Sequence, residues 1–184
     1  GSGLLALVAE LLDAGVILPS GKMATKKEYR EAHPGSPLIG VNDDSQRRFW
    51  LAPPVVQGER GVYLSQTDVR QLQLAKGAIV AGIKTLLARS ELEEDDVKKV
   101  YLAGAFGAYV DPRNLIRLGV LPAAWQDRIC FAGNSSKAGA AMALLSGATR
   151  LHAEEISRKV DYFELSKCCD FEKLFVCNMS FTYE

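Results

Sequence analysis

The sequence contains few of the side chains on which most catalytic and metal sites depend. It contains two histidines, His33 and His152, so histidine-ligated metal sites and Ser-His-Asp catalysis have few side chains to draw on. The chain has four cysteines: Cys130, Cys168, Cys169 and Cys177. Because they form no Cys-x-x-Cys pair and fit no disulfide framework, we expect free thiols and no metal site. Any chemistry is expected to come from a bound ligand.

The sequence also lacks an excess of charge of one sign and a long hydrophobic run. Lysine plus arginine and aspartate plus glutamate balance at 22 each, and no basic block or stripe occurs. This disfavours nucleic acid and anionic membranes as partners. The apolar run from Leu4 to Val8 is far shorter than the ~20 residues that span a bilayer, and no basic segment precedes it. We therefore expect a cytoplasmic protein without nucleic-acid or membrane partners.

Hydrophobic residues make up 48% of the 184 residues, which is enough for one compact domain. Apolar spacing predicts helices over 4–14, from about 65 to 90, over 112–118, up to about 145 and over 149–159. Bulky and β-branched runs predict short strands over 48–51 and 61–64, fully buried strands over 97–103 and 128–132, and a strand over 160–165. Residues 19–48 show no sustained pattern, and residues 171–181 are expected to cover the core. Alternating strands and helices indicate an α/β fold with parallel central strands.

Two glycine-containing loops follow the two central strands. The first is Gly104, Ala105, Phe106 and Gly107, and the second is Gly133, Asn134 and Ser135. Ligands of α/β sheets bind outside the carboxyl ends of the strands, so the loops should be neighbours beside a ligand. Glycine permits positive φ and close approach, and a following helix N-terminus favours an anion such as phosphate. Neither loop matches a known phosphate-binding motif, so the spacing alone leaves ligand binding and plain packing open.

The long helix offers a second candidate surface. Gln73, Lys76 and Gly77 share one face, which is distinct from the apolar stripe that contains Val69 and Ile83. A mid-helix glycine costs about 1 kcal/mol relative to alanine, which indicates that something approaches the helix closely there. Lys76 is then a candidate contact for phosphate or ribose, although lysines more often only solvate a helix face.

Four runs of the sequence, in this order, resemble the C-terminal domain of reductive activators of corrinoid-dependent enzymes: TDVRQLQLAKGAIVAGIKTLL, VYLAGAFGAYVDPRNLIRLGVLP, AGNSSKAGAAMALLS and YFELSKCCDFEKLF. The opening GSGLLALVAELLDAGVI also resembles that family, which leaves only residues 19–48 outside the likeness. The resemblance implies an ATP-binding fold of the sugar kinase, Hsp70 and actin type (ASKHA), in which two ribonuclease-H-like lobes clamp a nucleotide. Residues 1–184 would be a single domain, the C-terminal lobe of a longer nucleotide-binding domain, with 19–48 as a poorly patterned insertion.

The resemblance also implies which residues contact the nucleotide. The run from Leu102 to Gly107 would be the adenosine loop, and Gln73 and Lys76 would lie on a helix that faces the nucleoside. In this family the complete protein uses a 2Fe-2S domain and ATP with Mg²⁺ to return a Co(II) corrinoid protein to Co(I). The sequence has no iron-sulfur cysteine spacing and no Asp-Ile-Gly-Thr-Asn-Gly phosphate loop. The cluster, the first lobe and the Mg²⁺ ligands would therefore lie in an absent N-terminal part, and this chain alone is not expected to turn over ATP.

Three alternatives stay open. The chain could be a docking module that binds a corrinoid protein without nucleotide, an activator of a radical dehydratase, or a small-molecule kinase. A kinase needs a catalytic aspartate, and the one beside a glycine loop, Asp111, is expected instead to cap the helix that begins at Pro112. The expected partners are a corrinoid protein and the chain's own N-terminal lobe, while the identity of the corrinoid protein and a homodimer are left open.

Overall fold

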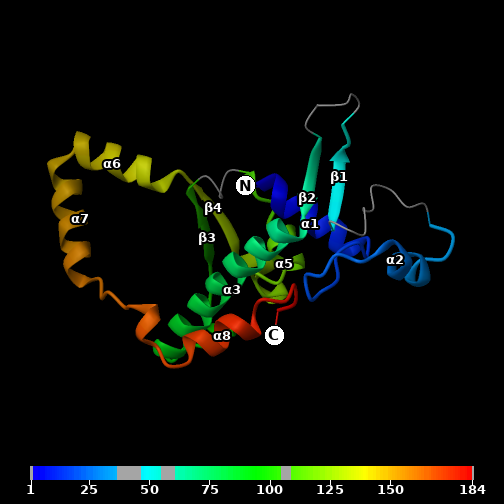
Figure 1. Cartoon of the computed structure of the whole chain (residues 1–184). Helices are drawn as coiled ribbons and strands as arrows, with labels where there is room; N and C mark the ends of the chain where they lie inside the picture. The colour runs from blue at the N-terminus through cyan, green and yellow to red at the C-terminus, as the bar shows by residue number, and fades with distance from the viewer. Residues whose placement is uncertain (1, 37–46, 55–60, 105–108, 184) are drawn as a thin grey trace.

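The computed structural model describes residues 2–36, 47–54, 61–104 and 109–183 (Figure 1). The helices are α1 (Ser2–Asp13), α2 (Lys26–Ala32), α3 (Gln66–Arg89), α5 (Pro112–Arg117), α6 (Ser135–Leu145), α7 (Gly147–Lys159) and α8 (Phe171–Cys177). The strands are β1 (Arg48–Ala52), β2 (Val62–Ser65), β3 (Val100–Ala103) and β4 (Ile129–Gly133). Short 3₁₀ helices occupy Glu94–Asp96, Ala123–Arg128 and Leu165–Lys167. Within the described ranges no helix is long and apolar enough to cross a membrane.

The strands form two separate pairs. β1 and β2 make an antiparallel hairpin, whereas β3 and β4 pair in parallel, as the alternation of strands and helices predicts. The expectation that the central strands are fully buried is wrong, because 63% of Tyr101 and 55% of Phe131 are exposed. Parallel sheets are normally covered on both faces, but among the described residues no third strand joins this pair. The β3–β4 sheet therefore presents uncovered aromatic surface.

The main core gathers around α1 and the segment from α5 to residue 125. The 3.6-residue spacing of the apolar residues in α1 buries Leu5 and Val8 against Leu118 and Trp125. Gly15 has a φ of +69°, so it ends α1 in the left-handed conformation, as the sequence indicates. The Arg117 guanidinium of α5 contacts the carboxylates of Glu10, at 2.8 Å, and Asp13, which ties α5 to the last turns of α1.

Helix α3 begins at a capping box and has two different faces. The Ser65 side chain accepts from the Asp68 N–H at 3.1 Å, and the Asp68 carboxylate accepts from the Ser65 N–H at 2.8 Å. The apolar stripe is not the best-buried face, because half of Ile79 is exposed. The face with Gln73 and Lys76 is buried instead, and α8 packs along α3 (Figure 1).

Helices α6 and α7 meet at a steep angle and extend away from the rest of the molecule (Figure 1). No residue of either helix is buried, and Leu144 and Leu145 are 87% and 85% exposed. The chain then returns to α3 through 160–164. The predicted strand over 160–165 is wrong: Tyr162 is 87% exposed and this stretch pairs with no described strand. Its bulky residues have strand propensity, but that propensity depends on a partner strand to pack against.

Residues 19–36 contain more structure than their composition indicates. Thr25 and Glu28 form a capping box, in which the Thr25 side chain accepts from the Glu28 N–H and starts α2. Ile17 and Met23 form an antiparallel bridge, and both are almost fully buried. The Thr-x-x-Glu spacing is a recognisable signal for the start of α2, and sequence reasoning missed it. Residues 37–46 lie outside the described ranges.

Candidate functional site

The first group of predicted site residues lies at the carboxyl edge of the β3–β4 sheet. Gly104 follows β3 with a φ of +76°, and Gly133 ends β4 with a φ of +59°. Ala103 is paired with Gly133 across the two strands, so the two glycine loops begin side by side, as expected. A Cβ atom built on either glycine meets no other atom within 4 Å. Open space therefore lies beside both glycines, and neither is explained by tight packing within the described residues.

The N-terminus of α6 completes this edge. The Asn134 Oδ1 atom accepts from the Lys137 N–H at 3.0 Å and so caps α6. Asn134 and Ser135 are exposed, and Ser135 is the first residue of the helix. The unpaired N–H groups of a helical first turn, together with the helix dipole, favour an anion. The remaining residues predicted for this site, Ala105, Phe106 and Gly107, lie outside the described residues.

The carboxylate nearest in sequence to this edge is already engaged. The Asp111 Oδ1 atom accepts from the Arg113 N–H at 2.9 Å and caps α5, as expected. The Arg113 guanidinium bonds the same carboxylate at 2.7 Å, and this interaction holds the pKa of Asp111 below its ordinary value. Asp111 is therefore an ionised, paired cap and a poor general base. Within the described ranges no three or more His, Cys, Asp or Glu side chains gather in a way that could hold a metal ion.

The second group, on α3, lies against the C-terminal segment of the chain. The Gln73 amide donates to the Ser20 and Met179 carbonyls, both at 2.9 Å, which uses both of its N–H bonds. The Lys76 ammonium is 1% exposed and donates to the Ser180 and Thr182 carbonyls, both at 2.7 Å. The two side chains thus bind the backbone of residues 179–182, which we call the C-terminal tail.

Gly77 explains why the tail and α8 come so close to α3. A Cβ atom built there would lie 2.9 Å from the Phe175 carbonyl oxygen and 3.1 Å from Met179 Cγ. The close approach that a mid-helix glycine indicates is therefore present, and the approaching group is α8. A nucleotide contact by Gln73 and Lys76 stays a prediction, and it would require the tail to leave α3.

Two more hydrogen bonds hold the C-terminal residues of the chain in place. The Phe181 N–H donates to the Pro19 carbonyl at 2.7 Å, and the Tyr183 hydroxyl donates to Glu94 Oε1 at 2.6 Å. Burial, followed by the hydrogen bond to Glu94, raises the pKa of Tyr183, so the phenol stays neutral. Sequence reasoning missed these partners because the acceptors are far away in the sequence and, apart from the Glu94 carboxylate, are backbone carbonyls, which any residue type can supply.

An apolar groove of about 580 Å³ separates α3 from β3 and the start of α1. The apolar stripe of α3 forms one wall with Leu72, Ile79 and Ile83, and β3 contributes Val100 and Leu102. The apolar stripe of α3 therefore faces this groove, which explains its partial exposure.

Comparisons with known proteins agree on one family. A family model described as "C-terminal domain of RACo the ASKHA domain" matches residues 1–184. Corrinoid activation enzyme RamQ of Eubacterium limosum is 31% identical over 185 residues, which is 98% of this chain and 30% of that protein. The Co(II) methylated amine-specific corrinoid protein reductase of Methanosarcina barkeri is 31% identical over 123 residues, 66% of this chain and 23% of that protein. A solved structure, titled "Reductive activator for corrinoid,iron-sulfur protein", superposes with a TM-score of 0.79 at 33% identity and covers 98% of this chain and 28% of that one. The chain thus spans less than a third of the length of each.

Proposed function

Because the chain belongs to the family of the C-terminal ASKHA domain of RACo, we propose that it supplies one lobe of an ATP site in a reductive activator of corrinoid proteins. The observation that carries this proposal is the pair of left-handed glycines, Gly104 and Gly133, at one carboxyl edge with open space beside them. Adenosine needs a backbone that it can approach closely, and phosphate needs N–H donors such as those of the first turn of α6. The residues at the edge fit half of such a cradle.

In this proposal the chain's own residues bind and orient the nucleotide. Gly104 lies against the nucleoside, while Gly133, Asn134 and Ser135 direct N–H groups toward the phosphates. Mg²⁺ supplies charge neutralisation at the phosphates when it is bound, and its ligands belong to the rest of the protein. Gln73, Lys76 and Gly77 join the site only if the C-terminal tail moves.

The redox part of the activity belongs to the whole protein. We propose that the complete protein carries a 2Fe-2S cluster and returns the Co(II) form of a corrinoid protein to Co(I) in the cytoplasm. ATP binding would favour one conformation of the activator and of its complex with the corrinoid protein, and this preference would drive the uphill electron transfer. Because the chain spans less than a third of the length of its relatives, we propose that ATP turnover needs residues from the rest of the protein.

A second candidate is a docking module that binds the corrinoid protein without nucleotide. The extended α6–α7 segment favours it, because Leu144, Leu145 and Leu151 are 87%, 85% and 60% exposed. Exposed apolar surface that gathers on one segment is typical of interaction sites. A docking module would retain the corrinoid protein in a pull-down and would ignore ATP.

A calorimetric titration of MgATP into the full-length protein separates the two candidates. Gly104→Val places a side chain where the nucleoside would lie, and left-handed backbone strain adds about 1–3 kcal/mol of instability. Gly35→Val is the matched control, because Gly35 has a φ of +83° and equally open surroundings. We expect wild type and Gly35→Val to bind MgATP and Gly104→Val to bind at least tenfold more weakly. Equal affinity of all three proteins would place the nucleotide elsewhere, and no binding to wild type would favour the docking module.

A further inference from the structure

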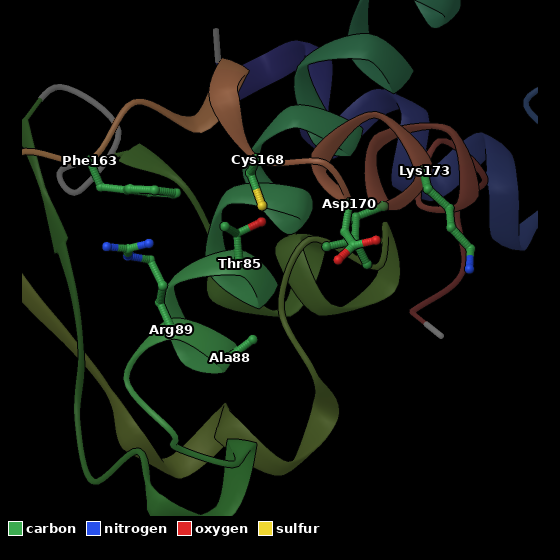
Figure 2. A pocket seen from close by; sticks show the side chains of 8 residues that line it. Thr85, Ala88, Arg89, Phe163, Cys168, Asp170 and Lys173 are labelled. Atoms are coloured by element: carbon green, nitrogen blue, oxygen red, sulfur yellow. The ribbon is translucent and has the colours of Figure 1, made fainter.

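A second cavity, of about 460 Å³, lies between the C-terminal half of α3 and the segment that leads into α8 (Figure 2). Its lining residues are Thr85, Ala88, Arg89, Phe163, Cys168, Asp170, Lys173 and Leu174. Helix α3 ends at Arg89 and the chain then enters β3 at Val100, so the cavity lies at the end of the sheet opposite Gly104 (Figure 1). It is therefore separate from the proposed nucleotide site.

The charged groups of the cavity are predominantly cationic. The Arg89 guanidinium lies 4.0 Å from the centre of the Phe163 ring, which fixes its position by a cation–π contact. Within the described part of the chain, neither Arg89 nor Lys173 has a carboxylate within 4.0 Å. Asp170 is the single acid in the lining. Two cations and one carboxylate favour a small ligand with more than one anionic group.

An unsatisfied hydroxyl lies at the base of the cavity. Thr85 is 4% exposed, and its Oγ1 atom has no hydrogen-bond partner. Figure 2 shows this oxygen directed toward the Cys168 sulfur, which is a free, half-buried thiol. A buried hydroxyl without a partner is unfavourable, so this oxygen would gain from a bound ligand or from a small movement of the Cys168 side chain that brings the sulfur within hydrogen-bonding distance.

We propose that Cys168 is a thiol-exchange site for small disulfides that carry carboxylate groups. Arg89 and Lys173 bind the carboxylates, the Phe163 ring and Leu174 contact the connecting carbons, and the Thr85 hydroxyl donates to the Cys168 thiolate. The thiolate attacks one sulfur of the disulfide, a new S–S bond joins Cys168 to half of the ligand, and the other half leaves as a thiolate that takes up the proton that Cys168 lost. The step exchanges one disulfide for another and needs no further oxidant.

The neighbouring Cys169 provides an internal comparison. It is exposed, and its sulfur lies 3.7 Å from Asp170 Oδ2, so a carboxylate lies beside it instead of two cations. Asp170 lies beside Cys169 and also lines the cavity, so an anionic reagent meets repulsion at Cys169, whereas at Cys168 the attraction of Arg89 and Lys173 outweighs that repulsion. The two adjacent cysteines should therefore have opposite charge preferences.

The test uses three methanethiosulfonates that differ in charge: sulfonatoethyl (anionic), methyl (neutral) and trimethylammonioethyl (cationic). Each is reacted with the full-length protein, and the rate at each cysteine is read by peptide mass spectrometry. We expect the anionic reagent to favour Cys168 and the cationic one to favour Cys169. Oxidised glutathione, a disulfide with four carboxylates, should form its adduct at Cys168 ahead of Cys169.

Three variants assign the selectivity to the cavity. Arg89→Gln should slow the anionic reagent at Cys168 about threefold, as expected for one nearby charge in a water-like dielectric, and should leave the neutral reagent unchanged. Arg150→Gln, on the exposed surface of α7, is the matched control and should change neither rate. Thr85→Val should slow all three reagents at Cys168 about tenfold relative to Cys169, because the thiolate loses its donor. Equal anionic and cationic rates at Cys168, or an anionic rate at Cys168 that Arg89→Gln leaves unchanged, would overturn the proposal.

Discussion

Replacing Lys76 by methionine is the sharpest test of how the C-terminal tail is held. Methionine matches lysine in length but donates no hydrogen bond, so the Ser180 and Thr182 carbonyls lose their ammonium partner. A buried acceptor without a donor costs about 1–3 kcal/mol, and the exposed residue Thr182 should lie at the low end. Relief from burying a charge offsets part of this loss. After this offset we expect Lys76→Met to lower the free energy of unfolding by about 1–3 kcal/mol, out of a total that is typically about 5–15 kcal/mol.

Urea unfolding followed by tryptophan fluorescence measures the global loss, and hydrogen exchange measures the local one. The local reporter is the Phe181 N–H, which donates to the Pro19 carbonyl in the folded tail and should lose protection in Lys76→Met. Lys98→Met, at an exposed position, is the matched control and should stay within about 0.5 kcal/mol of wild type. The reasoning is refuted if Lys76→Met is as stable as the control and Phe181 stays protected. Loss of MgATP binding without loss of stability would assign Lys76 to the nucleotide instead.

Two further predictions concern Gly77 on α3 and Glu28 on α2. Gly77→Ala should destabilise the protein despite the better helix propensity of alanine, because its Cβ would lie 2.9 Å from the Phe175 carbonyl oxygen. In Gly82→Ala the Cβ meets no atom closer than 3.5 Å, so this variant should be more stable than wild type by up to about 1 kcal/mol in thermal unfolding. The hydrogen bond from the Lys22 ammonium and, to a smaller extent, the capping hydrogen bonds lower the pKa of Glu28 from 4.5 to about 2. The stability that this carboxylate gives to α2 is therefore present above pH 4.5 and is lost as the pH falls toward 2. An NMR titration of Glu28 with an inflection near pH 4.5 would contradict this.

Local signals allowed much of the fold to be predicted. Helix α3 was predictable because Ser65 provides a cap and the apolar residues repeat every three to four positions. The strand pair β3–β4 was predictable because each strand is an apolar run that ends in a glycine. Gly104 and Gly133 also identified the edge of the sheet, because the chain turns there with a positive φ, a conformation for which glycine is the usual residue.

The partners of each surface were not predictable, because they depend on segments far away in the sequence. Spacing showed that Gln73, Lys76 and Gly77 share a face, but not that α8 and the C-terminal tail would cover it. The resemblance to the reductive activators favoured a nucleotide there, and tail carbonyls leave no sequence signal by which to recognise them. The strand expected over 160–165 failed for the same reason, since none of the strands that the structure describes pairs with it.

The most direct test of the central proposal is the absorption change that accompanies conversion of Co(II) to Co(I) in a corrinoid protein mixed with the full-length activator and a low-potential reductant. The proposal predicts that Co(I) appears when MgATP is added, that Gly104→Val abolishes this ATP dependence, and that Gly35→Val keeps it. Co(I) formation that needs no ATP, or that Gly104→Val supports as well as wild type does, would contradict a nucleotide site at this glycine edge.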